Sequence, residues 1–415
     1  MRPLAALLLA VLPASAGAGA EMFDAPAARF ASRVDAAALA VLAVQYRGRV
    51  GVLDTLAREQ LDHLCGEEAP ERLEPTFAYL ELHFNAGAYL DRPVIQVRGA
   101  ALRERLAGAL DGPAADALRR TGRIAPACLL DDEARELLLR TGRAGRDDLN
   151  RAAALPSVRD TLAALAQGSP QHRVSLDRLS LAYEAFLGEG LLRMVPEGGG
   201  RWAEAGAAPP AGARAALEEL AQDWRARDAE RVNALAAELA AELPALAPAE
   251  YPSSALRRLE RLYNRAWRAT VAWVGFAAAA VLLIVAAGSG RRWARAAGLW
   301  AFAASLAALL AGFVVRWVLS GRAWYLPPIM NQFEAVSGSV LLGGAVALGL
   351  ELARGRNYFA LAAGLYATAA LLFCFLLPGR TGAGLGATHG ILGSPVMAAH
   401  VSVIIVGHAL AGMSF

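Results

Sequence analysis

The chain has 415 residues, of which 56% are hydrophobic and 19% are charged, and its formal net charge is +3. The length allows two domains or more, and the hydrophobic fraction is too high for a single soluble globule of this size. This charge balance provides no strongly basic face, so we exclude a nucleic-acid partner. Charged residues are concentrated in the first 265 positions and nearly vanish after them.

The first twenty residues, MRPLAALLLAVLPASAGAGA, have the pattern of a secretory signal peptide. A basic residue near the start is followed by an apolar run and then by the small-residue triplet Ala18-Gly19-Ala20. The apolar run is shorter than the ~20 residues that a membrane span needs. We therefore expect a signal peptide over 1–20, with an uncleaved anchor as the alternative, and export of the residues that follow.

Residues 21–250 are expected to form a mostly helical periplasmic domain. Asp54 is predicted to be the N-cap of a helix that ends at Gly66. The segment 216–243 is alanine-rich and amphipathic, which predicts one long helix. The apolar run 38–46 fits a strand or a helix equally well.

Two stretches rich in proline and glycine predict irregular structure. Residues 196–212 are predicted to be a loop, and three prolines between Pro244 and Pro252 indicate a linker. Residues 251–268 follow as a basic amphipathic linker helix, with the sequence LRRLERLYNRAWR in its second part.

The three cysteines, Cys65, Cys128 and Cys374, show no CxxC spacing, which excludes a haem-attachment or thioredoxin-like motif. Cys65 and Cys128 both lie in the exported part, where one disulfide can form, and the sequence leaves their pairing open. Cys374 falls within an apolar run and is expected to be a small core residue.

Residues 269–415 predict a polytopic α-helical transmembrane bundle, so the fold class is mainly α. Four complete spans are expected at 269–287, 294–318, 335–353 and 358–377, and a fifth, incomplete span begins near 396. The first and third loops carry most of the loop arginines: Arg291, Arg292, Arg295, Arg354 and Arg356. By the positive-inside rule these loops are cytoplasmic, which places the amino-terminal domain in the periplasm and the chain in the bacterial inner membrane.

Two histidines in the fifth span are the first candidate ligands. His400 enters this span from the outer side, about one turn in, where a neutral imidazole is a good axial ligand for haem iron. The alternative is an interfacial histidine hydrogen-bonded to water. His408 lies ~12 Å deeper in a regular helix and cannot ligate the same iron, so we expect it to pack inside the bundle.

The loop before the third span carries a second candidate group. Asn331 and Glu334 are one helical turn apart and can face the same side of the span. Arg316 and Arg322 are available to neutralise either Glu334 or the propionates of an anionic ligand. The alternative is a helix cap at Asn331 with a solvated Glu334.

Three stretches carry motifs of a known family. Residues 321–337, GRAWYLPPIMNQFEAVS, are similar to a GR-x-P-x-SN-x-YE pattern, with Met330 and Phe333 in place of the usual Ser and Tyr. Residues 398–412, AAHVSVIIVGHALAG, are similar to an HVSxMxxxYA helix. Residues 44–61, VQYRGRVGVLDTLAREQL, resemble a VQ-x-x-GR-x-x-PLDTLAR start. The sequence thus resembles the cytochrome c assembly protein family, the CcsA/ResC-type haem-handling proteins of system II cytochrome c maturation, in its longer form with a periplasmic domain.

The resemblance implies a cofactor, partners and residue roles. It implies that His400 is a periplasmic axial ligand to the iron of haem, with Asn331 and Glu334 in supporting roles. His408 falls where the family commonly has Tyr, and no role transfers to it. The implied function is to present haem at the periplasmic face for covalent attachment to apocytochrome c, together with a ResB/CcsB-type partner protein, as a component of a ligation system rather than a stand-alone enzyme.

The sequence also departs from this family. A tryptophan-rich WWD segment and a second periplasmic histidine are expected after the His400 helix, and no tryptophan follows Trp324. We therefore expect the chain to be a fragment or one half of a split protein. Two other functions stay open: a membrane-anchored periplasmic scaffold without haem, and a membrane b-type cytochrome, which needs two histidines at matching depth on facing helices.

Overall fold

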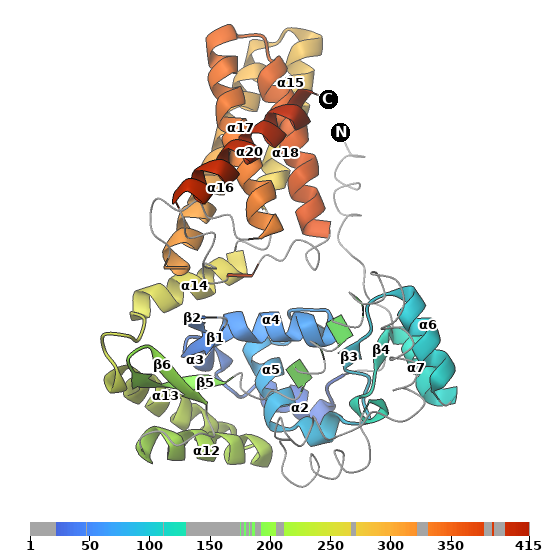
Figure 1. Ribbon diagram of the computed structural model, residues 1–415, viewed down its shortest axis with the longest axis vertical. Coiled ribbons are helices and arrows are strands. Elements are labelled where there is room, and N and C mark those ends of the chain that lie inside the picture. The colour runs from blue at the N-terminus through green and yellow to red at the C-terminus, as the bar shows by residue number, and fades with distance from the viewer. Residues whose placement is uncertain are drawn as a thin grey trace. The chain divides into compact units, whose positions relative to one another are not determined.

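The computed structural model of the chain is mainly helical (Figure 1). It describes residues 22–46, 48–110, 112–129, 192–204, 211–266, 271–321, 331–376, 384–385 and 395–414, and the single positions 175, 178, 179, 182, 185 and 186. The chain divides into two compact units, one of Met1–Val34 with Gln60–Glu189 and one of Asp35–Glu59 with Gly190–Phe415.

The first unit is built around a helix, α5, whose ten residues are all buried. Its described elements are α2 (Ala25–Ala31), η1 (Pro70–Arg72), α5 (Pro75–Phe84), η2 (Ala86–Tyr89), β3 (Ile95–Gln96), α6 (Ala100–Ala109), α7 (Gly112–Thr121), β4 (Arg123–Ile124), which pairs antiparallel with β3, and η3 (Pro126–Cys128). The Glu74 carboxylate caps α5 by accepting a hydrogen bond from Thr76 N at 2.8 Å. Buried Glu81 accepts hydrogen bonds from the Tyr89 hydroxyl at 2.8 Å and from the Asn85 amide at 3.1 Å, so the carboxylate that α5 carries into the core is satisfied.

The second unit contains the membrane helices and a smaller mixed part. The described elements of the mixed part are α3 (Ala36–Ala40), β1 (Ala43–Tyr46), β2 (Arg49–Val52), the first half of α4 (Leu53–Cys65), β5 (Arg193–Gly198), β6 (Arg201–Glu204), α12 (Ala211–Ala226), α13 (Ala229–Leu246) and α14 (Ser254–Ala266). β1 pairs with β2 and β5 with β6, each as an antiparallel hairpin. Helix α14 confirms the helical structure predicted within 251–268.

The helix predicted from Asp54 to Gly66 is present as α4, but its first turn differs from the prediction. Because α4 begins at Leu53, Asp54 lies inside the first turn and not at the N-cap. Its carboxylate is fully buried and accepts hydrogen bonds from the side chains of Arg58 and Asn264, so it is engaged elsewhere. The predicted end is confirmed: Gly66 follows the last helical residue with a φ of +77°, a conformation that favours glycine.

The single long helix predicted over 216–243 is wrong. The structure has two helices there, and α12 ends at Ala226. Arg227 takes a φ of +62°, and the Asp228 carboxylate caps α13 by accepting a hydrogen bond from Arg231 N at 3.1 Å. The break follows from Asp228, whose short side chain satisfies the backbone at a helix start better than inside a helix.

Two further segments are more regular than the sequence indicates. The predicted loop 196–212 begins as the β5–β6 hairpin, with Gly199 and Gly200 at positive φ in the turn. The run 38–46, which fitted a helix or a strand, is both: α3 covers its first part and β1 its last. A short apolar run carries no periodicity that separates these outcomes.

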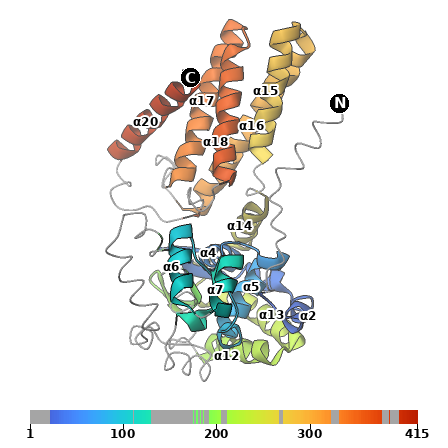
Figure 2. The ribbon, with the colours of Figure 1, turned by 90° about the vertical axis from the view of Figure 1, so that its right-hand side faces the viewer.

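Four of the described helices are long and apolar enough to cross a membrane. They are α15 (Val271–Ser289), α16 (Arg292–Leu319), α17 (Gln332–Arg354) and α18 (Tyr358–Leu376), and they lie side by side in Figures 1 and 2. A fifth helix, α20 (Pro395–Ser414), covers the segment where the sequence predicts a further span and packs against α17 and α18. Long apolar helices are therefore present at the positions of the first four predicted spans.

Packing between the membrane helices uses aromatic rings and small residues. Phe276 of α15 and Phe302 of α16 are fully buried with ring centroids 5.3 Å apart. A Cβ at Gly298 would lie 2.9 Å from a Leu283 side-chain carbon, so only glycine allows α15 and α16 to approach this closely. Large apolar side chains such as Ile284 are exposed, as expected for a surface that faces lipid.

Candidate functional site

A buried ion pair joins the carboxyl end of α16 to the amino end of α17. Arg316 Nη2 and Nε donate to Glu334 Oε1 at 2.6 and 3.0 Å. The two side chains are 1% and 0% exposed. The Arg316 guanidinium also lies 5.2 Å from the Phe333 ring centroid, within the range of a cation–π contact. Burial of both charges requires this pairing, because an isolated charge at this depth is costly.

Arg316 donates two further hydrogen bonds. Its Nη1 donates to the Tyr263 hydroxyl at 2.9 Å, and its Nη2 donates to Gly384 O at 3.1 Å. Burial raises the pKa of the Tyr263 hydroxyl above its ordinary value, while the neighbouring guanidinium acts in the opposite direction. Of the two roles that the sequence leaves open for Arg316, the structure therefore shows the neutralisation of Glu334. Arg322, the second arginine considered, lies outside the described residues.

Asn331 caps α17 and holds the chain that follows α18. Its Oδ1 accepts a hydrogen bond from Glu334 N at 2.8 Å, and its Nδ2 donates to Gly384 O at 3.1 Å. The cap predicted as one alternative is thus present, but the solvated Glu334 that accompanied it is wrong, because the carboxylate is fully buried against Arg316. Asn331 and Glu334 come together as expected. The capping bond joins them directly, and Asn331 and Arg316, the partner of Glu334, both donate to Gly384 O.

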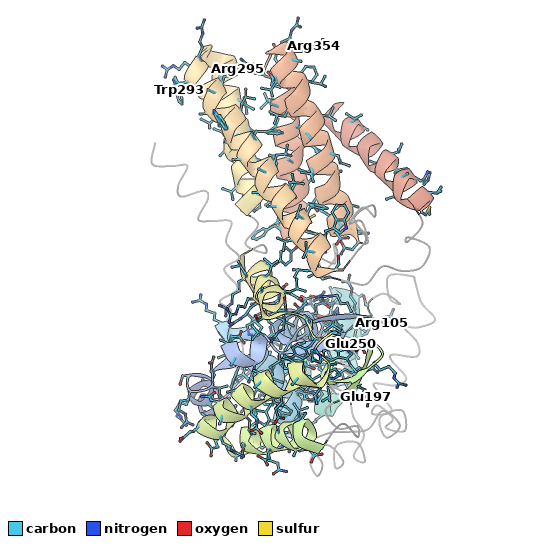
Figure 3. The ribbon with its side chains drawn as sticks, turned by 90° about the vertical axis from the view of Figure 1, so that its left-hand side faces the viewer. Arg105, Glu197, Glu250, Trp293, Arg295 and Arg354 are labelled. Carbon is cyan, nitrogen blue, oxygen red and sulfur yellow. The ribbon has the colours of Figure 1, made fainter. Side chains whose placement is uncertain are left out.

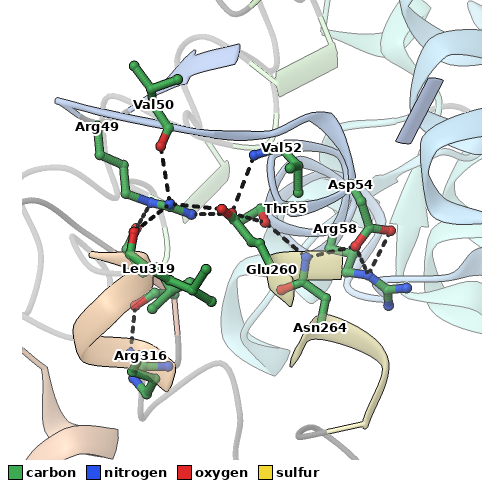
Figure 4. A network of polar contacts seen from close by, with 12 residues as sticks. Arg49, Val50, Val52, Asp54, Thr55, Arg58, Glu260, Asn264, Arg316 and Leu319 are labelled. Carbon is green, nitrogen blue, oxygen red and sulfur yellow. Dashed lines mark hydrogen bonds and ion pairs between the residues drawn. The ribbon is translucent and has the colours of Figure 1, made fainter. Parts of the chain in front are cut away.

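A second arginine, Arg49 of strand β2, lies near Arg316 at the carboxyl end of α16 (Figure 4). Its Nη2 lies 2.5 Å from Glu260 Oε1 of α14, and the side chains are 9% and 4% exposed. Arg49 Nη1 donates to Leu319 O at the end of α16, at 3.4 Å, and Arg49 Nε donates to Leu385 O at 3.0 Å. Arg49 lies in the motif of 44–61, but the sequence carries no signal that pairs it with Glu260.

The Glu260 carboxylate is fixed from its other side by α4. The Thr55 hydroxyl donates to Glu260 Oε1 at 2.5 Å, and Asn264 Nδ2 donates to Thr55 Oγ1 at 2.9 Å and to Asp54 Oδ2 at 2.7 Å. Arg58 completes the set by pairing with Asp54 at 3.0 Å. α14 contributes Glu260 and Asn264 to this set, and α4 contributes Asp54, Thr55 and Arg58. The hydrogen bonds between the two helices satisfy the carboxylate and amide groups that α14 buries against α4.

The opposite end of the bundle has its own polar contacts. Arg295 and Arg354 lie together at this end in Figure 3. Arg295 Nε donates to Asn357 Oδ1 at 2.6 Å, and its Nη2 lies 3.4 Å from Glu351, which is fully buried. The Glu351 carboxylate also accepts hydrogen bonds from Asn357 N and from Phe359 N, so it caps the start of α18. The first and third loops, which contain the arginines that set the expected orientation, are thus joined.

His400 and His408 both lie on α20, and both are exposed, so the predicted packing of His408 inside the bundle is wrong. His408 Nδ1 lies 2.9 Å from Ile404 O of its own helix. The His400 side chain makes no hydrogen bond or ion pair with any residue that the structure describes. The structure therefore brings Asn331 and Glu334 together but does not bring His400 into contact with them.

Acidic, histidine and cysteine side chains are the usual protein ligands of metal ions. Within the described ranges, no group of three or more such side chains is close enough to hold a metal ion. No protein-family model matches the chain, and no curated protein matches it. The assignment to the cytochrome c assembly family stays a prediction from the sequence motifs.

Proposed function

We propose that the chain is a membrane component of system II cytochrome c maturation, which binds haem at the periplasmic face and presents it to apocytochrome c. The observation that carries this proposal is the exposed imidazole of His400, one turn into α20, with no partner among the described residues. A haem ligand needs an accessible, unengaged nitrogen, and His400 meets that requirement.

The direction in which α20 runs along the bundle also supports the proposal. α20 begins ten residues after Leu385. The residue before Leu385, Gly384, accepts hydrogen bonds from Arg316 and Asn331. In both views α20 runs obliquely beside the other helices, with its carboxyl end towards the end of the bundle that carries the first and third loops (Figures 1 and 2). The arginine-rich first and third loops lie at the other end, which the positive-inside rule assigns to the cytoplasm. His400 would then face the periplasm, where apocytochrome c receives haem.

The supporting roles of Asn331 and Glu334 follow from their bonds. Both polar atoms of the Asn331 side chain and Oε1 of the buried Glu334 carboxylate are used within the protein, so neither side chain fits a direct contact with haem. We assign them the role of fixing the start of α17 and the approach to α20. Bound haem supplies the vinyl groups that form thioethers with the CxxCH thiols of the substrate. The chain's own part would be to hold and orient this cofactor through His400.

The competing functions make different predictions for haem. A scaffold without haem needs no ligand at His400. A b-type cytochrome needs facing histidines at matching depth, and the segments of α15 to α18 contain no histidine, which disfavours it.

The test is a titration of haemin into the purified full chain in lipid discs. We expect saturable binding of one haemin per chain, with a shifted Soret band. His400→Ala should weaken binding by about tenfold or more, the effect of losing an interaction of ~1.4 kcal/mol, and added imidazole should restore part of the Soret band. Absence of saturable binding to the wild-type chain would favour the scaffold.

A further inference from the structure

The segment that leads into α20 is anchored by two arginines at consecutive carbonyl groups. Gly384 O accepts hydrogen bonds from Arg316 Nη2 and Asn331 Nδ2, each at 3.1 Å. The next carbonyl, Leu385 O, accepts a hydrogen bond from Arg49 Nε at 3.0 Å. The Leu385 side chain is 5% exposed and packs in a small apolar cluster with Tyr263 and Leu319. Charge-assisted hydrogen bonds of this kind are stronger than neutral ones.

The guanidinium group of Arg49 connects three parts of the unit at once. It pairs with Glu260 of α14, donates to Leu319 O at the end of α16, and donates to Leu385 O before α20. A carbonyl in the last turn of a helix has no partner inside that helix, so Arg49 also supplies one for α16. The side chain comes from the hairpin β1–β2, at a distance of 336 residues along the chain from Leu385.

Two glycines make room for this arrangement. A Cβ at Gly51 would lie 2.8 Å from Arg49 Nη2, so a side chain there would displace the guanidinium. A Cβ at Gly384 would lie 2.5 Å from Glu59 Oε1 of α4. A side chain at either position would therefore require the end of the Arg49 or the Glu59 side chain to shift.

We propose that Arg49 is a positioning residue for the His400 helix: the exported hairpin fixes where α20 begins by holding Leu385. His400 follows Leu385 by fifteen residues, and α20 exposes large side chains such as Val396, 80% exposed, and Val403, 72% exposed. α20 also packs against α17 and α18, and the anchor at Leu385 limits where the chain can enter these contacts. The part of this inference that concerns haem deepens the proposed function and rests on it.

The first arm of the test does not involve haem. Leu385→Cys is introduced into a chain whose native cysteines are replaced by alanine, and the rate of labelling by a membrane-impermeant maleimide is measured in lipid discs. We expect Arg49→Gln to raise this rate by about tenfold or more, because it removes charge-assisted hydrogen bonds that hold the segment closed. Arg49→Lys should give a smaller increase, since one ammonium nitrogen replaces three spread over a guanidinium.

Matched controls separate this effect from a general loss of folding. Arg231→Gln removes the exposed pair of Arg231 with Glu219, at 51% and 48% exposure, and should leave the labelling rate unchanged. Glu260→Gln weakens the pair while Arg49 keeps its two carbonyl bonds, and should give a smaller increase than Arg49→Gln. If Arg49→Gln fails to fold, the lysine and Glu260 variants carry the test. Equal labelling rates in all the variants that fold would overturn the proposal that Arg49 holds Leu385 in place.

The second arm measures the Soret band of the haemin complex in the same variants, without the added cysteine. We expect Arg49→Gln to shift or weaken the band and Arg49→Lys to restore part of it. Faster labelling of the Leu385→Cys thiol with an unchanged Soret band would confirm that Arg49 holds Leu385 and would overturn its role in positioning His400. If the wild-type chain binds no haemin, the proposed function fails. The labelling experiment alone then tests whether Arg49 holds Leu385.

Discussion

Arg316 Nη2 lies 2.6 Å from Glu334 Oε1, and both side chains are almost completely buried. Removing one partner leaves the other charge buried without compensation. We therefore expect Glu334→Gln or Arg316→Met to destabilise the folded chain by about 3–5 kcal/mol. Chemical unfolding of the chain in mixed micelles, followed by tryptophan fluorescence, measures this loss.

The double variant Arg316→Met/Glu334→Leu provides the control for that prediction. It removes both charges together and replaces them with apolar side chains, so it should recover most of the stability that either single variant loses. A double variant as unstable as the sum of the singles would show that the pair contributes through its shape and its bonds to Tyr263 and Gly384, and not through charge compensation.

Asn331 makes two bonds that a pair of substitutions can separate. Asn331→Ala loses the cap of α17 and the bond to Gly384 O, and should cost about 1–2 kcal/mol. Asn331→Ser keeps a capping oxygen for Glu334 N but has no amide to donate to Gly384, so it should recover most of the loss. Amide hydrogen exchange at the start of α17 reports the cap directly. Equal exchange in the two variants would contradict its capping role.

The sequence predicts the helices of the bundle closely because their signal is long and strong. The four spans and the start of the next helix agree with the structure within about three residues, since ~20 consecutive apolar residues leave few alternatives. The Asp228 break and the β5–β6 hairpin were missed because each depends on a few short-range bonds that no periodicity reveals.

The candidate site was predictable in its composition but not in its contacts. Asn331 and Glu334 are close in sequence, and an arginine at the end of the preceding span suggested a partner for the carboxylate. The role of Arg49 rests on contacts with residues more than 200 positions away, including Glu260 and Leu385. A single sequence carries no local signal for such pairings, and the place of Arg49 in the motif of 44–61 names no partner.

The orientation of the bundle is a prediction that labelling in whole cells can test. Ser254 is the first residue of α14, and Ser289 ends α15 at the arginine-rich end; both are exposed. In chains without other cysteines, an impermeant maleimide added to cells with a permeabilised outer membrane should label Ser254→Cys and leave Ser289→Cys unlabelled. Lysis should expose both. The reverse pattern would invert the topology and remove His400 from the periplasmic face.

The buried thiol of Cys65 predicts how stability depends on pH. Cys65 and Cys128, whose pairing the sequence leaves open, are both thiols in the structure. Burial raises the pKa of the Cys65 thiol from 9.0 to about 12, so the unfolded chain loses this proton at a lower pH than the folded chain. Since the unfolded state binds fewer protons in this window, the free energy of unfolding should fall as the pH rises from 9 towards 12. Cys65→Ala should flatten this part of the profile, and an unchanged slope would contradict the assignment.

The measurement that tests the central proposal most directly is a comparison of three histidine variants with haemin bound in lipid discs. His400→Ala should lose most of the Soret absorbance, and His408→Ala should keep it. His400→Met should keep a haem complex with a higher midpoint potential, because a methionine axial ligand raises the potential of the iron. A wild-type spectrum and potential in His400→Ala and His400→Met would contradict the account, because His400 would then not be a ligand.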